Sequence, residues 1–190
     1  MDILSKEEAR FDKARLVSEI EKGKIILHPT DTIYGLGCSA INEGSVRKLR
    51  ELKNNDSRPF SVIAPSKEWI LDNCEIDEKD KDWLDRLPGP FTLILKLKNK
   101  NSISKHVNSG LDTIGVRMPE HWISEMVEEL GVPFITTAAL VEGNRVIINP
   151  NETSQEYRKS VHYAIDEGDL NGIPSTIVDL SSKKVLINER

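Results

Sequence analysis

The chain has 190 residues, of which 30% are charged and 38% belong to the hydrophobic set, and its formal net charge is −5. This length suits one domain with a sizeable core, and the acidic balance argues against a broad nucleic-acid-binding surface, although it leaves a local basic patch open. Apolar runs such as 134–141 are far shorter than the roughly 20 residues of a membrane span, and the polar start resembles neither a secretory signal nor a transit peptide. We therefore expect a cytoplasmic globular protein without a membrane segment.

Capping signals and hydrophobic periodicity predict alternating helices and strands in the first half of the chain. Ser5 and Glu8 form a capping box, and the helix that they start should run to about Glu21. The other elements expected in this half are a strand at 24–27, a helix with apolar positions at 46, 49 and 52, a strand at 60–64, a helix at 77–87 and a strand at 91–97.

The second half continues the same alternation after a polar loop at 99–112. Thr153 and Glu156 form another capping box, for a helix that should end near His162. The other elements expected here are a strand at 113–118, a helix at 122–130 followed by a C′ glycine at 131, a strand at 134–140, and late strands at 175–180 and 184–188. Alternation predicts the α/β class, and several strand links too short for a crossover predict a mixed sheet.

Cysteine and histidine usage gives no sign of a metal site. Cys38 and Cys74 lie far apart and form no CxxC pair, and a disulfide is not expected in the cytoplasm. The four histidines are scattered along the chain. We therefore predict no protein-bound metal.

A polar segment follows the first of these expected strands. Residues 28–37 read HPTDTIYGLG, in which Pro29 fixes one backbone angle and two glycines let the chain approach a neighbour closely. Hydroxyls and a carboxylate at the end of a strand suit a ligand site, because ligands of open α/β sheets bind at that edge. The competing interpretation is a turn that caps the next helix, and spacing alone favours neither.

A basic stretch at residues 47–58 carries five cations in this acidic chain. Lys53 and Arg58 fall in the loop before the next strand, where a Lys point charge and an Arg fork suit phosphate binding. A solvated helix face is the competing interpretation. It accounts well for the three cations of the helix and less well for Lys53 and Arg58.

Two later segments place polar side chains beside buried strands. Residues 115–119 read GVRMP, and an arginine such as Arg117 within a strand needs a partner. A ligand carboxylate and a structural ion pair would serve equally well. Residues 174–179 read PSTIVD, with two hydroxyls at the start of an apolar strand, which is a weak signal when taken alone.

Taken together, these segments resemble the YrdC/Sua5 family, whose typical members are threonylcarbamoyl-AMP synthases. The five similar segments are 28–37 (P-T-[DE]-T-x-Y-G-L), 53–60 (Lys-x-Arg…Pro), 88–93 (P-G-P-[LF]-T), 115–119 (G-V-R-x-P) and 175–179 (S-T-[IV]-V-D). The resemblance covers about residues 15–180. It implies a YrdC/RibB-like fold, with a twisted mixed β-sheet flanked by helices in a single α/β domain over 1–190.

The resemblance also implies an enzyme, namely a nucleotidyltransferase that joins L-threonine, bicarbonate and ATP into threonylcarbamoyl-AMP and releases pyrophosphate. The product would pass to a tRNA threonylcarbamoyltransferase of the Kae1/TsaD type, which makes t6A at adenosine 37 of tRNA. ATP would be a substrate accompanied by Mg²⁺, and weak RNA binding is a further expected property.

Side-chain roles follow from the same resemblance. The catalytic pair would be Lys53 and Arg117. The threonine-binding set would be Thr30, Thr32, Tyr34, Arg117 and Ser175, and the nucleotide-binding set would be Lys53, Arg58, Thr137 and Ser175. No covalent nucleophile is needed, so catalysis would rest on positioning and electrostatic stabilisation.

The sequence departs from the family pattern at two places. Asn55 stands where Lys-x-Arg has its Arg, and Ala138 and Leu140 replace a Ser-x-Asn pair, with Glu142 where a second Ser is usual. Loss of one positioned donor costs on the order of 10²–10³ in rate. The main alternative to an active synthase is therefore an impaired paralogue that binds nucleotide, amino acid or RNA without making the adenylate. A carbamoyl-transferring YrdC-type module is a further alternative, although such modules usually sit within larger chains.

Overall fold

In the computed structural model, which describes residues 1–54, 57–141, 145–182 and 185–188, eleven strands form one mixed sheet. The strand order is β1 (Asp2–Ser5), β11 (Tyr163–Asp166), β2 (Ile26–His28), β3 (Gly35–Gly37), β8 (Phe134–Ala138), β4 (Ser61–Ile63), β7 (Thr113–Arg117), β6 (Phe91–Leu97), β12 (Thr176–Asp179) and β13 (Leu186–Asn188), with β5 (Cys74–Glu75) pairing β6. The sheet contains both parallel pairs, such as β4–β7, and antiparallel pairs, such as β6–β7. The predicted mixed sheet is therefore confirmed.

Seven α-helices lie among the described residues. They are α1 (Lys6–Phe11), α2 (Lys13–Glu21), α3 (Glu43–Leu52), α4 (Lys67–Asn73), α5 (Lys81–Asp85), α6 (Ile123–Leu130) and α7 (Gln155–Ser160). A separate antiparallel pair joins β9 (Leu140–Val141) to β10 (Arg145–Val146), and short 3₁₀ turns lie at Glu78–Asp80, Lys100–Ser102 and Pro150–Glu152. No helix in the described part of the chain has the length and apolar character needed to cross a bilayer.

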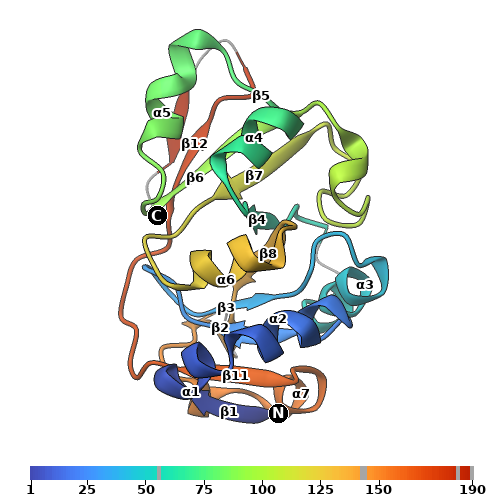
Figure 1. Ribbon diagram of the computed structural model, residues 1–190, viewed down its shortest axis with the longest axis vertical. Coiled ribbons are helices and arrows are strands. Elements are labelled where there is room, and N and C mark those ends of the chain that lie inside the picture. Colours follow the sequence, from blue (N-terminus) through green and yellow to red (C-terminus); the bar gives the residue numbers. More distant parts are fainter. Residues whose placement is uncertain (55–56, 142–144, 183–184, 189–190) are drawn as a thin grey trace.

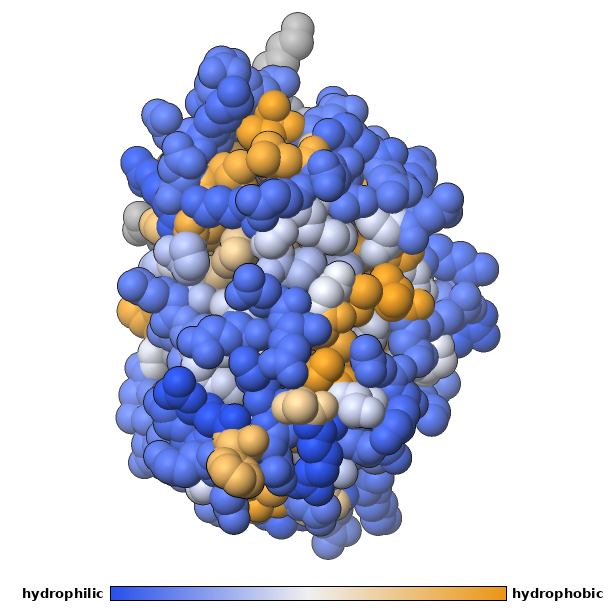
Figure 2. Space-filling view, in the orientation of Figure 1, coloured by the Kyte–Doolittle hydropathy of each residue, from blue (hydrophilic) through white to orange (hydrophobic). Residues whose placement is uncertain are grey.

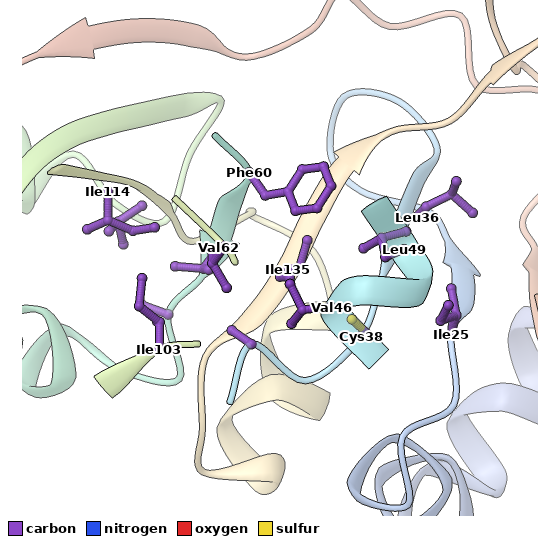
Figure 3. Close-up of a cluster of buried hydrophobic side chains, with 14 of the residues drawn as sticks. Ile25, Leu36, Cys38, Val46, Leu49, Phe60, Val62, Ile103, Ile114 and Ile135 are labelled. Atoms are coloured by element: carbon purple, nitrogen blue, oxygen red, sulfur yellow. The ribbon is translucent and has the colours of Figure 1, made fainter. Parts of the chain in front are cut away.

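The two faces of the sheet pack against different helices. Apolar side chains of α3, α4, α5 and α7 join the larger core cluster with alternate strand residues such as Val62, Val116 and Ile135. Figure 3 shows part of this cluster, with Val46 and Leu49 of α3 beside Ile135. Helices α1, α2 and α6 form the second cluster on the other face. Burial of each large aliphatic side chain contributes about 1.5–3 kcal/mol, so the sheet is held from both sides.

The second face is only partly covered by these helices. The residues that alternate with the first cluster pack under α1, α2 and α6 at one end of the sheet, as Ile63 and Phe134 do. Nearer β12, strand residues with the same orientation line an open cavity instead. On the side of the molecule in Figure 2, the surface is largely hydrophilic, with apolar side chains in a few patches.

Local signals predicted most elements but not every boundary. Ser5 accepts from the Glu8 amide in a complete capping box, as predicted, but the expected single helix to Glu21 is broken at Asp12. The capping box at Thr153 was wrong, because Ser154 caps α7 and the Thr153 hydroxyl donates to the Pro150 carbonyl. Strands β1, β3, β5, β10 and β11 and helix α4 were not predicted.

Candidate active site

A cavity of about 500 Å³ opens on the second face of the sheet. Alternate strand residues line it, because successive side chains of a strand point to opposite faces. In β7, Thr113, Gly115 and Arg117 face the cavity, whereas Ile114 and Val116 belong to the larger core cluster. The same period of two that builds the core therefore aims a set of polar groups at one hollow.

The pairing register aligns a row of residues across the cavity floor. Successive Cα partners in this row are Asp179, Ile94, Gly115, Ser61 and Thr136, from five neighbouring strands. A Cβ atom at Gly115 would lie 2.7 Å from Ser61 Oγ. Glycine at this position therefore keeps the centre of the floor clear.

Hydroxyl groups dominate the polar lining. They come from Thr30, Tyr34, Ser61, Thr92, Thr113, Thr136, Thr137, Ser175 and Ser181. Ser175 Oγ and Thr92 Oγ1 lie 2.7 Å apart and are both buried, so one donates to the other. A hydroxyl can both donate and accept a hydrogen bond, and its hydrogen can rotate. These side chains can therefore donate to phosphate or carboxylate oxygens of a ligand.

Two predicted cations reach the cavity from the loop after α3. Lys53, the C-cap residue of that helix, donates from Nζ to the Ala138 carbonyl at 3.0 Å. Arg58 also lines the cavity, and its own carbonyl accepts from Arg50. Asp179 is the sole carboxylate among the described lining residues. Because Arg117 is paired with Asp31, the charges left to compare are Lys53 and Arg58 against Asp179, and this balance favours an anionic ligand.

The sequence left two partners open for Arg117, a ligand carboxylate and a structural ion pair. The structure contains the ion pair. Arg117 Nη2 lies 2.5 Å from Asp31 Oδ1, and both side chains are about nine-tenths buried. The guanidinium also approaches Thr32 Oγ1 at 3.4 Å, while Nε has no partner among the described residues. Arg117 also lines the cavity. The ion pair with Asp31 therefore fixes the guanidinium at the cavity wall.

The turn at 30–34 is built by its own hydroxyls. Thr30 Oγ1 accepts from the amides of Thr32 and Ile33 and donates to the Ile33 carbonyl, and it lies 2.9 Å from Thr32 Oγ1. Asp31 Oδ2 accepts from the Glu120 amide. These bonds give the segment one conformation, with Thr30 on the cavity wall and Thr32 directly behind it against Arg117.

Two other side chains of this segment are committed to the protein. Tyr34 is among the lining residues but is fully buried in the larger core cluster. Its hydroxyl donates to the Gly168 carbonyl and accepts from the Glu167 amide, and burial raises its pKa to about 12. His28 is fully buried, and burial lowers its pKa to about 3. The imidazole is therefore neutral, with Nδ1 3.1 Å from the Pro29 carbonyl.

Seven of the eight predicted site residues line this cavity. They are Thr30, Tyr34, Lys53, Arg58, Arg117, Thr137 and Ser175, with Thr32 one contact behind the wall. The prediction missed Ser61, Thr92, Thr113, Thr136, Asp179 and Ser181 as site residues. A polar residue at every second position of an otherwise buried strand was the signal that could have found most of them.

The departures from the family pattern fall on the cavity wall where they are described. Ala138 and Leu140 both line it, and the Leu140 amide donates to the Tyr157 hydroxyl at 3.4 Å. An alanine and a leucine side chain present no donor there. Asn55 and Glu142 lie outside the described residues.

Comparison with known proteins identifies the family. Residues 18–190 match the family model Sua5_yciO_yrdC, whose description reads "Telomere recombination". The chain belongs to the Sua5/YciO/YrdC family. It is 35% identical over 187 residues to a Methanocaldococcus jannaschii protein named "Putative threonylcarbamoyl-AMP synthase", covering 96% of this chain and 87% of the relative.

Two solved members of the Sua5/YciO/YrdC family have the same fold. P. abyssi Sua5 complexed with L-threonine superposes with a TM-score of 0.86 at 27% identity, over 98% of this chain. This chain spans 56% of that longer protein. Escherichia coli YciO superposes with a TM-score of 0.85 at 22% identity, covering 100% of this chain and 94% of YciO. The predicted family and fold are both confirmed.

Proposed function

We propose that this member of the family is an L-threonylcarbamoyladenylate synthase. It joins L-threonine, bicarbonate and ATP into threonylcarbamoyl-AMP and releases pyrophosphate. The observation that carries this proposal is the convergence of the Thr30–Thr32 turn, Lys53, Arg117 and Ser175 at one cavity. The curated relative is named for this product, and the P. abyssi Sua5 structure contains L-threonine.

The cavity suits a reaction in which charge moves along phosphates. The amine of threonine adds to bicarbonate with loss of water, and a carbamate oxygen then attacks the α-phosphorus of ATP while the bond to pyrophosphate breaks. Negative charge grows on the α-phosphate oxygens and on the leaving group. The positive charges of Lys53 and Arg58 would stabilise it, and hydroxyls such as Ser175 and Thr92 would donate hydrogen bonds. No covalent intermediate with the protein is required.

The threonine end of the cavity is the wall formed by Arg117 and the 30–34 turn. Arg117 supplies a positive charge at this wall for a substrate carboxylate, and the bond from Nη2 to Asp31 holds the guanidinium in place. The Tyr34 hydroxyl is bound to backbone groups, so Tyr34 would act on this wall by holding its backbone in place. Thr30 and Thr32 supply the hydroxyls of this end.

Mg²⁺ would enter as part of the ATP substrate. Among the described residues no group of three acidic, His or Cys side chains could hold a metal ion, and Asp179 is the one carboxylate lining the cavity. Phosphate oxygens and water would therefore supply most of its ligands, as is usual for Mg²⁺. The ion would neutralise charge on the departing pyrophosphate.

The product is consumed by a transferase that modifies tRNA. A tRNA threonylcarbamoyltransferase would take the threonylcarbamoyl group to adenosine 37, in the cytoplasm. Direct contact with tRNA is a separate property of the chain. Its net charge of −5 makes any such contact weak and local.

A second candidate function is ligand binding without turnover. Ala138 and Leu140 favour it, since both line the cavity at positions where the family pattern has Ser and Asn. The polar wall at the threonine end is intact, and this observation favours the active synthase.

One assay separates the two functions. Purified protein is mixed with ATP, threonine, bicarbonate and MgCl₂, and both pyrophosphate and the adenylate are measured. The synthase requires equal amounts of the two products and no product when threonine is omitted. ATP binding by calorimetry with no adenylate above background would establish the binding function instead. Binding to tRNA that survives Lys53→Ala and falls with added salt would mark an RNA-binding protein.

A further inference from the structure

Glu167 is a buried carboxylate with three side-chain partners. Its Oε2 lies 3.2 Å from Lys6 Nζ and 3.3 Å from His121 Nε2, and its Oε1 accepts from the Trp122 indole. The side chain is 10% exposed. Burial disfavours its charge, but the hydrogen bonds and the neighbouring cations prevail and lower its pKa. Glu167 therefore joins the start of α1 to the segment before α6 through an ionised group.

The backbone of residues 167 and 168 forms hydrogen bonds with Tyr34, which belongs to the candidate active site. The Glu167 amide donates to Tyr34 Oη at 3.0 Å, and Tyr34 Oη donates to the Gly168 carbonyl at 2.8 Å. One phenol thus closes two backbone hydrogen bonds. Tyr34 belongs to the turn that places Thr30 on the cavity wall and Thr32 against Arg117.

Glu167 also begins a segment that crosses most of the sheet. Residues 167–175 connect β11 to β12, and six strands lie between these two in the sheet order. The orange-red chain in Figure 1 covers this distance in an extended path. A chain that spans several strands in nine residues has to run extended, so little slack remains between its two ends.

The crossing segment then touches the site twice more. A Cβ atom at Gly172 would lie 1.8 Å from the Thr32 carbonyl oxygen, so this part of the segment lies directly on the Thr32 backbone. Pro174 and Ser175 follow within the cavity lining, and the Thr176 amide donates to the Pro90 carbonyl.

We propose that Glu167 and Tyr34 are positioning residues that anchor the 167–175 segment, so that Ser175 and the Thr30–Thr32 turn face the same substrate. Neither group touches the reacting atoms. Both act through the segment and the turn that they join. The expected change in KM for threonine rests on the proposed function. The expected change in amide hydrogen exchange rests on the geometry alone.

Three variants test the anchor at its two residues. Tyr34→Phe keeps the ring and removes both hydrogen bonds to residues 167 and 168. Glu167→Ala removes the carboxylate, and Glu167→Gln retains an acceptor for the Trp122 indole. The matched controls are Tyr163→Phe, in β11, and Glu125→Gln, on the exposed face of α6.

The first readout is amide hydrogen exchange, which needs no substrate. We expect Tyr34→Phe and Glu167→Ala to raise exchange at residues 167–173 and 31–33 by at least tenfold, with Glu167→Gln between them and the wild type. Exchange in β6 and β8 stays as in the wild type, and the control variants match the wild type throughout. Wild-type exchange at 167–173 in both Tyr34→Phe and Glu167→Ala overturns the proposal, whether or not the protein makes the adenylate.

The second readout is the kinetic split for threonine. We expect Tyr34→Phe to raise KM for threonine at least tenfold while kcat changes less than threefold, because positioning is lost and the reacting groups remain. Faster exchange with an unchanged KM would overturn the role at the site. If the wild type makes no adenylate, the proposed function fails, and the exchange data alone then decide the anchor.

Discussion

Arg117 Nη2 and Asp31 Oδ1 lie 2.5 Å apart in an ion pair that is about nine-tenths buried at the wall of the cavity. Asp31 in turn accepts from the Glu120 amide, so the carboxylate has two donors. The burial of Arg117 lowers its pKa, and Asp31 acts in the opposite direction. The pair is therefore a structural support for the cavity wall as well as a part of it.

Removing one member of this pair should cost stability. Arg117→Ala leaves the Asp31 charge buried without its partner, and such a loss costs about 3–5 kcal/mol. The double variant Asp31→Asn/Arg117→Met removes both charges, so we expect it to recover most of the free energy of unfolding without recovering synthase activity. Urea unfolding and pyrophosphate release measure the two effects. Equal instability of the single and double variants would show that the ion pair is not the cause.

The strands that line the cavity show what the sequence could and could not predict. One face of each strand joins the core, and the other face lines the cavity. The sequence predicted strands at 113–118 and 175–180, but it did not reveal that Thr113 and Asp179 line the same cavity as Lys53. That juxtaposition depends on strand order, which places β4, β7, β6 and β12 side by side although they are distant in sequence. Only the family resemblance predicted that residues from separate segments, such as Lys53 and Arg117, belong to one site.

Hydrogen bonds between residues that are distant in the sequence could not be predicted for the same reason. The sequence marked Tyr34 by its place in a motif, but nothing marked Glu167, which lies 133 positions away and meets the Tyr34 hydroxyl through its amide. Backbone amides carry no residue signature. The ion pair of Arg117 was one of two interpretations left open, and only the fold brings Asp31 to it.

Lys53 should be needed for turnover but not for folding. Its Nζ donates to the Ala138 carbonyl, and a hydrogen bond of this kind contributes about 1 kcal/mol. We expect Lys53→Met to lower turnover on the order of 10²–10³-fold through loss of a fixed charge, with the fold intact by circular dichroism. Lys48→Met, on the exposed side of α3, is the matched control. Comparable turnover in the two variants would contradict a phosphate role for Lys53.

Restoring the family donors should raise turnover if their loss has slowed the enzyme. Ala138→Ser and Leu140→Asn place donors on the cavity wall, and Asn55→Arg restores the guanidinium of Lys-x-Arg. We expect the triple variant to exceed the wild-type rate, by on the order of 10²-fold for a donor that is fully engaged. Leu71→Asn, at an exposed position on α4, controls for a general effect of a new amide. A wild-type rate that matches the triple variant would show that the native side chains suffice.

His28 should make the protein less stable in acid. Burial lowers its pKa to about 3 in the folded protein, against about 6.5 in an unfolded chain. Between these two values the unfolded chain binds one more proton at this site, so stability is fully present above pH 6.5 and falls as the pH drops toward 3. The steepest contribution is about 1.4 kcal/mol per pH unit.

The variant His28→Leu should remove this contribution while keeping a side chain of similar volume. Urea unfolding between pH 6 and 4 is expected to show a shallower slope for His28→Leu than for the wild type, by about 1 kcal/mol per pH unit. At pH 8 the imidazole is neutral in both states, so the difference measured there gives the packing cost alone. Other groups with shifted pKa values, such as Glu167, are present in both proteins and cancel in the comparison. Parallel slopes from pH 6 to 4 would show that His28 is protonated in the folded protein as readily as in the unfolded chain.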